Sequence, residues 1–261
     1  GAFYTPKEIV QYMCMESLIA YLQTNVDDLP TKEAIRQFVT THDASVLDNI
    51  ADEIDIRLKD VKICDPAIGS GAFPMGLLKE LFLCRTALEG IEQNKAAEIK
   101  KHIIQQNIYG VDIEKGAVDI ARLRFWLSLI VDEETPQALP NLDFKIMQGN
   151  SLLEQYDGVD LSVLMTEEID FNEIGVHATF FDDEFYKEKQ ELQALLNEYY
   201  ECIDHKQKKS LRKNIVTTIK KQIHDRGLSI NFEDIDLAGN DQFMLWHTWF
   251  HDVFSQGGFN I

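Results

Sequence analysis

The chain has 261 residues, of which 45% are hydrophobic, and its formal net charge is −19. Such a length and composition support a hydrophobic core, either in one large domain or in a domain with an insertion. The sequence shows no apolar stretch of membrane-spanning length and no signal peptide, so we expect no membrane partner. The acidic balance argues against strong DNA binding by these residues themselves, because phosphate contacts need Lys and Arg.

The cysteines favour a reducing compartment. Cys14, Cys64, Cys84 and Cys202 are scattered and form no C-x-x-C pair. This spacing indicates neither a zinc site nor a disulfide framework, and it fits a cytoplasmic protein.

The first 60 residues predict helices that pack beside a sheet. The spacing of apolar residues predicts helices over residues 6–23, 32–41 and 44–58. Thr5 and Thr31 are candidate N-caps. Pro6 suits the first turn of its helix, and Glu8 would complete a capping box with Thr5.

Strands and helices then alternate as far as residue 148. We expect strands over residues 61–64, 108–112 and 143–148, and helices over residues 73–89, 96–106 and 115–131. This alternation predicts an α/β fold with a parallel sheet and right-handed crossovers.

The turn after the first strand, DPAIGSGAF at residues 65–73, is the most informative segment. Gly69 and Gly71 let the backbone turn tightly and approach a ligand without an intervening Cβ. Ser70 and the N–H groups at the start of the following helix can bind a carboxylate or another polar group. A strand, a glycine-rich turn and a helix are the context that a nucleotide-type cofactor needs.

The second predicted strand ends in an acid, within IYGVDI at residues 108–113. An acid at this position binds ribose hydroxyls in sheets of this class. The separation of Gly71 and Asp112 exceeds the usual spacing of about 20 residues. An additional helix, near residues 93–106, would account for the excess.

Taken together, these segments resemble the N6-adenine DNA methyltransferases of the N-P-P-Y class. The closest resemblance is to the large bacterial type II restriction–modification enzymes, as a methylase subunit or a fused restriction–methylation polypeptide. Residues 65–73 resemble motif I, D-P-A-x-G-S-G-x-F, and GAFYTPKEIV at residues 1–10 resembles motif X, G-x-F-Y-T-P-x-x-I-V. FKIMQGNSLL at residues 144–153 resembles motif III, and the helix over residues 117–127 is also similar to the family's.

The resemblance implies an S-adenosylmethionine-dependent, Rossmann-like methyltransferase fold, a three-layer structure whose sheet this chain supplies in part. In the family, motif I and the motif X threonine hold the methionine, the acid holds the ribose, and the next residue packs on the adenine. Asn150, which stands where the family often has Asp, would address the adenine amino group through its carbonyl oxygen. The implied cofactor-binding residues are Tyr4, Thr5, Asp65, Pro66, Ala67, Gly69, Ser70, Gly71, Asp112, Ile113, Asn150 and Ser151.

The family's acceptor chemistry lies in motif IV, (N/D/S)-P-P-(Y/F/W), and this sequence contains no Pro-Pro pair. GGFNI at residues 257–261 resembles the segment that leads into that motif. The resemblance therefore implies a fragment cut before its catalytic loop, which would bind cofactor weakly or not at all and would not methylate DNA. Double-stranded DNA would be recognised mostly outside these residues, where a nuclease domain or subunit would also lie.

We expect four parts along the chain. Residues 1–60 form a helical region with the cofactor arm, and residues 61–165 form the cofactor-binding core. Residues 166–240 form a charged helical insertion, with a hairpin near residues 182–226, and residues 241–261 return to the core. The hairpin holds a basic stretch, which is either a solvated helix face or a DNA backbone contact. It comprises Lys206, Lys208, Lys209, Arg212, Lys213, Lys220 and Lys221.

Two histidines and one short acidic segment allow other readings. His247 and His251 stand four apart in an aromatic-rich segment, residues 243–254, that is predicted to be helical. They could suit a metal, but core packing of the aromatic residues is the better interpretation. Asp204-His205-Lys206 resembles the end of a nuclease motif, P-D…(D/E)-x-K, but no Pro-Asp pair accompanies it, so we treat it as chance.

Other functions remain open at this stage. An N-P-P-Y methyltransferase that acts on RNA or on protein glutamine is one alternative. A non-catalytic scaffold that retains the fold is another. A nicotinamide oxidoreductase is disfavoured, because the third glycine of G-x-G-x-x-G is missing after Gly71.

Overall fold

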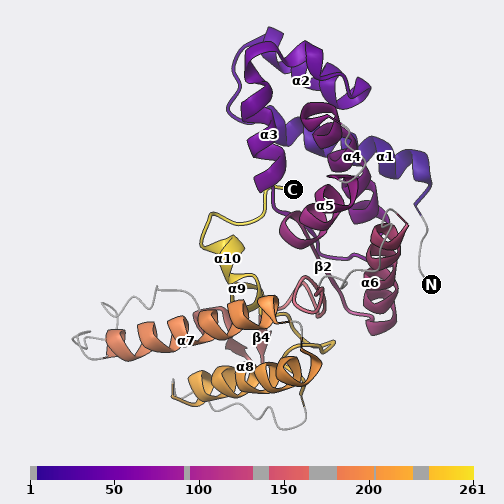
Figure 1. Cartoon of the computed structure of the whole chain (residues 1–261). Coiled ribbons are helices and arrows are strands. Elements are labelled where there is room, and N and C mark those ends of the chain that lie inside the picture. Colours follow the sequence, from indigo (N-terminus) through magenta and orange to yellow (C-terminus); the bar gives the residue numbers. More distant parts are fainter. Residues whose placement is uncertain (1–4, 91–94, 132–140, 165–180, 203, 226–234) are drawn as a thin grey trace. The chain divides into compact units, whose positions relative to one another are not determined.

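The computed structural model describes residues 5–90, 95–131, 141–164, 181–202, 204–225 and 235–261 (Figure 1). The chain divides into two compact units. The first, here called the sheet unit, contains residues 1–148 and 253–261, and the second, the hairpin unit, contains residues 149–252. The four-part division expected from the sequence is finer than this and stays a prediction.

The sheet unit begins with helices, as predicted. They are α1 (Lys7–Leu22), α2 (Leu29–Thr41), the 3-10 helix η1 (Ala44–Ile50) and α3 (Ala51–Asp60). The single helix expected over residues 44–58 is divided, because Asp48 takes a positive φ of 44° that no helix can continue. Helix α1 packs against α4, and the helices of this region lie together in Figure 1.

Both predicted threonine caps are wrong. Helix α1 has Pro6 as its N-cap, and the Pro6 carbonyl accepts hydrogen bonds from the N–H groups of Ile9 and Val10. Proline has no side-chain acceptor, so no capping box forms with Glu8. Helix α2 begins earlier than expected because the Asp28 carboxylate caps it, accepting the Thr31 N–H at 2.8 Å.

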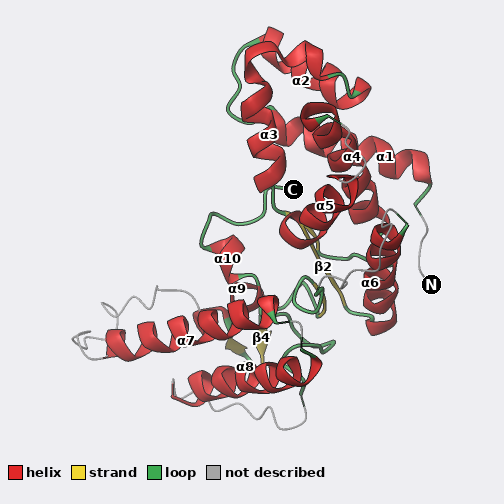
Figure 2. Ribbon diagram, viewed as in Figure 1, coloured by secondary structure: helices red, strands yellow, loops and turns green. Residues whose placement is uncertain are grey.

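The sheet consists of three parallel strands, which confirms the α/β prediction in this part (Figure 2). Strand β1 (Ile63–Asp65) pairs with β2 (Ile108–Asp112), and β2 pairs with β3 (Ile146–Gln148). Between β1 and β2 lie α4 (Ala72–Glu89), α5 (Lys95–His102) and the π-helix η2 (Ile103–Asn107). Helix α6 (Lys115–Ile130) connects β2 to β3.

The last residues of the chain lie along the free side of β1. Ile261 donates its N–H to the Lys62 carbonyl at 3.2 Å and accepts the Cys64 N–H at 2.8 Å. This bridging pattern is that of neighbouring parallel strands. The Asn260 carboxamide also accepts the Lys62 N–H at 2.8 Å. The C-terminal residues therefore extend the hydrogen bonding of the sheet on the side opposite β2.

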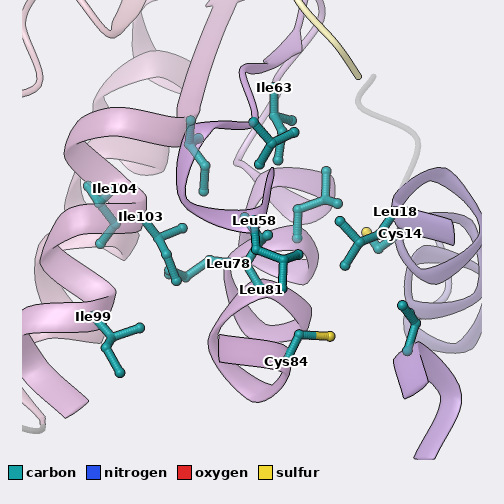
Figure 3. Packing of buried hydrophobic residues seen from close by; sticks show 14 of the residues in the cluster. Cys14, Leu18, Leu58, Ile63, Leu78, Leu81, Cys84, Ile99, Ile103 and Ile104 are labelled. Atoms are coloured by element: carbon teal, nitrogen blue, oxygen red, sulfur yellow. The ribbon is translucent and has the colours of Figure 1, made fainter. Parts of the chain in front are cut away.

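One hydrophobic core joins the N-terminal helices to the sheet (Figure 3). Cys14 and Leu18 of α1, Leu58 of α3 and Ile63 of β1 belong to it. Helices α4, α5 and η2 contribute the remaining labelled side chains of Figure 3, which are Leu78, Leu81, Cys84, Ile99, Ile103 and Ile104. Because these side chains share one core, the helical region and the sheet are stabilised together.

The hairpin unit contains the two long helices expected from the sequence. Helices α7 (Phe181–Glu201) and α8 (His205–Asp225) pack side by side (Figure 1). Before them lie strands β4 (Gln155–Tyr156) and β5 (Val159–Asp160), an antiparallel pair, and the 3-10 helix η3 (Ser162–Leu164). No helix in the described part of the chain is long and apolar enough to cross a membrane.

The aromatic-rich segment, residues 243–254, is not one helix as predicted. It forms α9 (Trp246–Trp249) and α10 (His251–Phe254), which Phe250 separates, so His247 and His251 share no helical face. Tertiary hydrogen bonds hold α9: Glu154 accepts both the backbone N–H of His247, at 3.0 Å, and its Nδ1, at 2.7 Å. Phe243, Trp249 and Phe250 are buried, which confirms core packing. The described residues contain no three-residue metal cluster.

Gly110→Ala tests the packing of the turn on the sheet. A Cβ at Gly110 would lie 2.3 Å from Cδ1 and 3.1 Å from Cβ of Ile68. We expect the substitution to lower the free energy of unfolding by about 1–3 kcal/mol, as overpacking does, in urea denaturation. Gly116→Ala is the control, because a Cβ there meets nothing within 4 Å and should be neutral or slightly stabilising in a helix. Equal stability of the Gly110 variant and wild type would contradict this account of the packing.

Candidate functional site

Two carboxylates stand at the same edge of the sheet. Asp65 is the last residue of β1 and Asp112 is the last residue of β2. Because the strands are parallel neighbours, their carboxyl ends open on the same side. In open α/β sheets, ligands bind outside these ends.

The turn between β1 and α4 is fastened directly to the end of β2. The Gly69 N–H donates to Oδ2 of Asp112 at 2.7 Å, and the Ile68 N–H donates to the Val111 carbonyl at 2.9 Å. At its start, the turn is held by Oδ1 of Asp65, which accepts the Ala67 N–H at 3.1 Å. The glycine turn and the acid that were predicted to share a site are therefore in contact.

Glycine is required at the two predicted turn positions because of their backbone conformation. Gly69 has a φ of 52° and Gly71 a φ of 82°, a region that side chains with a Cβ rarely adopt. Gly71 is also the N-cap of α4, and a Cβ there would be in ordinary van der Waals contact with Cβ of Ala121 on α6, at 3.4 Å. The positive φ, rather than a lack of space, therefore requires glycine at this position.

The start of α4 presents hydrogen-bond donors that have no acceptor in the described part of the chain. They are the N–H groups of Ser70, Ala72 and Phe73 and the Ser70 hydroxyl. Helix α4 has 18 residues, so its N-terminus carries the partial positive charge of a long helix. Such an arrangement suits an anionic group.

The surroundings of Asp65 disfavour its charged form. Burial raises the pKa of the Asp65 carboxyl, the Ala67 N–H partly offsets this, and the neighbouring Asp112 raises it further. No ion pair to Asp65 is present in the described part of the chain. A cationic group on a ligand would relieve both effects, so the site is suited to a molecule with a positive charge near Asp65.

An apolar side chain borders the acid. Ile113 follows Asp112 and is 49% exposed, although its backbone carbonyl is fixed by Nε2 of Gln148 at 3.1 Å. A half-exposed isoleucine on a held backbone offers a flat ligand an apolar surface. Pro66 and Ala67 are exposed at the same turn.

Two residues that the sequence analysis did not single out also position the turn. Nη1 of Arg124, on α6, donates to the Ser70 carbonyl at 2.7 Å. Gly110, in the middle of β2, makes room for the buried side chain of Ile68. A glycine inside an otherwise apolar strand indicates the close approach of other atoms, so Gly110 could have been found from the sequence, whereas the contact of Arg124 depends on tertiary packing.

Among the described residues of the N-terminal region, Cys14 of α1 contacts the end of the turn. Sγ of Cys14 contacts the Phe73 carbonyl at 3.4 Å, and a Cβ at Gly76 would lie 2.8 Å from that sulfur. Burial raises the pKa of Cys14 to about 12, so the thiol stays protonated and can donate this bond. Thr5 is partly exposed before α1 and no hydrogen bond links it to the turn, and Tyr4 lies outside the described residues.

Asn150 and Ser151 belong to the hairpin unit. Oδ1 of Asn150 accepts the Leu152 N–H at 3.2 Å, and the Ser151 carbonyl accepts Nε1 of Trp246 at 3.2 Å. The structure thus gathers Asp65, the turn, Asp112 and Ile113 into one site. The parts that Thr5, Asn150 and Ser151 would take in it stay predictions.

Comparison with known proteins identifies the class. The sequence profile described as "Eco57I restriction-modification methylase" matches residues 106–261, and that described as "MmeI, DNA-methyltransferase domain" matches residues 40–157. A protein of Methanocaldococcus jannaschii, named "Putative type II restriction enzyme and methyltransferase RM.MjaORFECS2P", is 32% identical over 178 residues. This match covers 60% of the chain and only 15% of the relative.

The α/β sheet and these matches define the class, which is that of the restriction–modification methylases. Because the first profile covers more than half of the chain, the chain belongs to the Eco57I restriction-modification methylase family. Its match spans a small part of the relative's length.

Asp65→Asn tests the cost of the buried carboxylate. Since the pKa is raised in the folded state, the contribution of Asp65 to stability is fully present below its ordinary value of 3.8 and is lost as the pH rises through the folded value. We expect the variant to be more stable than wild type at neutral pH, with the difference vanishing in acid. Urea unfolding at a series of pH values measures this.

Asp28→Asn is the control for the sign of that effect. Hydrogen bonds from Thr31 lower the pKa of Asp28, so its contribution is present above the ordinary value and is lost as the pH falls. The difference between wild type and variant should therefore change with pH in opposite directions at the two positions. A change in the same direction at both would show that burial does not govern Asp65.

Proposed function

We propose that the chain is the S-adenosylmethionine-binding part of a DNA adenine-N6 methyltransferase of a restriction–modification system. The observation that carries this is the hydrogen bond from the Gly69 N–H to Asp112, because it joins a glycine turn and an acid at one sheet edge. Membership of the Eco57I restriction-modification methylase family supports the transfer reaction. The sheet would then be the first half of a Rossmann-like, three-layer methyltransferase fold.

The residues present fit this cofactor chemically. The unused N–H groups at the start of α4 and the Ser70 hydroxyl suit its carboxylate. The buried Asp65, whose pKa is raised, suits its ammonium group. Asp112 retains free lone pairs after accepting from Gly69 and Glu114, so it can still accept from ribose hydroxyls. Ile113 offers an apolar surface to adenine.

When bound, the cofactor supplies a methyl group activated by a positively charged sulfur. The chain's own contribution is binding and orientation: Gly69 and Gly71 allow close backbone approach, and Arg124 fixes the Ser70 carbonyl. Fixed positioning of two reactants accounts for much of the barrier lowering in such transfers. The target adenine would be flipped out of the duplex to reach the site.

The adenine acceptor is proposed to be held by an N-P-P-Y motif, which the 261 residues do not contain. The chain by itself is therefore proposed to be inactive and to bind cofactor weakly. Tyr4, Thr5, Asn150 and Ser151 complete the proposed set of cofactor contacts. A methyltransferase acting on RNA or protein glutamine, or a non-catalytic scaffold, is the alternative.

The test of cofactor binding measures the binding of S-adenosylhomocysteine to the whole chain by ligand-observed NMR. We expect weak, saturable binding that Asp112→Ala weakens about tenfold or more, because a hydrogen bond to a charged group contributes about 1.5–3 kcal/mol. Asp119→Ala is the matched control, since Asp119 is exposed on α6. Identical binding by the two variants, or no saturable binding by wild type, would argue against the site.

Methyl transfer is tested with tritiated S-adenosylmethionine and unmethylated plasmid DNA. The 261-residue chain should incorporate no label, because the adenine-binding motif is missing. A longer protein in which an N-P-P-Y segment is joined after residue 261 should produce N6-methyladenine, identified by mass spectrometry of the digested DNA. Label incorporation by the chain alone, or methylcytosine as the product, would falsify the proposal.

A further inference from the structure

Helix α8 buries one of its sides inside the hairpin unit, to which it belongs. Leu211, Ile215, Ile219 and Ile223, at a constant spacing of four residues, are buried. On the neighbouring helix α7, the buried side chains include Leu192, Leu196 and Tyr199. The packing of α7 on α8 fixes which side of α8 is left to solvent.

The opposite side of α8 is basic. Lys206, Lys209 and Lys213 are exposed and follow one another at intervals of three and four residues. We call these three residues the lysine face. Polar side chains lie beside them, at Ser210, Asn214 and Thr217, and no acidic residue interrupts the row.

Carboxylates within the chain neutralise the flanks of α8 rather than the lysine face. Arg212 pairs with Asp236 at 3.1 Å, and Lys221 pairs with Glu188 at 3.3 Å and with Asp225 at 3.9 Å. In the part of the chain that the structure describes, Lys206, Lys209 and Lys213 have no carboxylate partner. Their charge is available to an outside group.

The arrangement also lowers the stability of the helix. The Asp204 carboxylate caps the start of α8 by accepting the Gln207 N–H at 2.8 Å, but the first turn itself contains no acidic residue, and positive charge near a helix N-terminus is unfavourable. Lys209 and Lys213 form a like-charged pair four residues apart, which is destabilising by a few tenths of a kcal/mol. A solvated helix usually alternates opposite charges at this spacing.

We propose that the lysine face contacts the phosphate backbone of double-stranded DNA. This inference rests on the proposed function, which supplies DNA as the substrate, and it assigns a binding surface to the helical hairpin. The row from Lys206 to Lys213 extends about 10 Å at 1.5 Å per residue, which corresponds to about three nucleotide steps of one strand. Lysine ammonium groups contact phosphates without reading sequence, so the face positions the duplex.

The experiment measures binding of the whole chain to a short fluorescein-labelled duplex by anisotropy over a series of salt concentrations. The variant Lys206→Gln/Lys209→Gln/Lys213→Gln removes three charges with a good helix former. The control Lys32→Gln/Lys79→Gln/Lys101→Gln removes the same charge from α2, α4 and α5 of the sheet unit. A third variant, with arginine at the three α8 positions, keeps the charge.

We expect the α8 glutamine variant to bind about 10- to 100-fold more weakly at low salt, and its plot of log K against log salt to be less steep by about two to three. The sheet-unit control and the arginine variant should bind like wild type. Circular dichroism checks that the helices persist. An equal loss in the sheet-unit control, an unchanged salt slope, or weak binding by a folded arginine variant would overturn the proposal.

Two further measurements distinguish failure of the DNA-surface proposal from failure of the cofactor proposal. Vesicles containing anionic phospholipid should bind less tightly than the duplex, and equally tight, lysine-dependent binding to them would reject DNA as the partner. S-adenosylhomocysteine binding should be the same in wild type and the α8 variants. If wild type binds DNA through α8 but does not bind this ligand, the cofactor proposal fails while the DNA surface stands.

Discussion

The hydrogen bond between the Gly69 N–H and the Asp112 carboxylate is the contact on which the site depends. It joins the turn after β1 to the end of β2. The Ile68 N–H holds the same turn by its hydrogen bond to the Val111 carbonyl, and the Ile68 side chain packs over Gly110. Three interactions of different kinds thus fix one short segment. Because the segment leads into α4, they also fix the direction in which the unused N–H groups at the start of α4 face.

The site differs from other parts of the sheet unit in how its charges are compensated. Several carboxylates elsewhere in this unit have cationic partners, as Glu16 has Arg36 at 2.7 Å and Glu89 has Arg85 at 3.0 Å. Asp65 has no such partner in the described residues, and the neighbouring Asp112 is also acidic. Proteins tolerate local conflicts of this kind mainly at functional sites, where a ligand supplies the missing interaction.

The candidate site of the sheet unit and the lysine face of the hairpin unit carry charges of opposite sign. The sheet unit offers two carboxylates at the ends of its strands, whereas the hairpin unit offers a row of lysines on α8. In a chain whose net charge is −19, three neighbouring lysines that have no carboxylate partner among the described residues are a local feature that the total charge conceals. The acidic total that argues against DNA binding by the chain as a whole is therefore compatible with one basic surface.

The sequence by itself determined the elements with strong local patterns. Apolar periodicity predicts the buried strand Ile108–Asp112, the alternation of strands and helices, and the pair of helices α7 and α8. The glycine-rich sequence predicts the turn, because glycine adopts backbone conformations that other residues rarely adopt. Only the tertiary structure decided the rest. It broke the aromatic segment at Phe250, where Glu154 holds α9 from a distant part of the chain. It also brought Arg124 to the Ser70 carbonyl. These outcomes depend on partners far away in sequence, and local spacing carries no information about them.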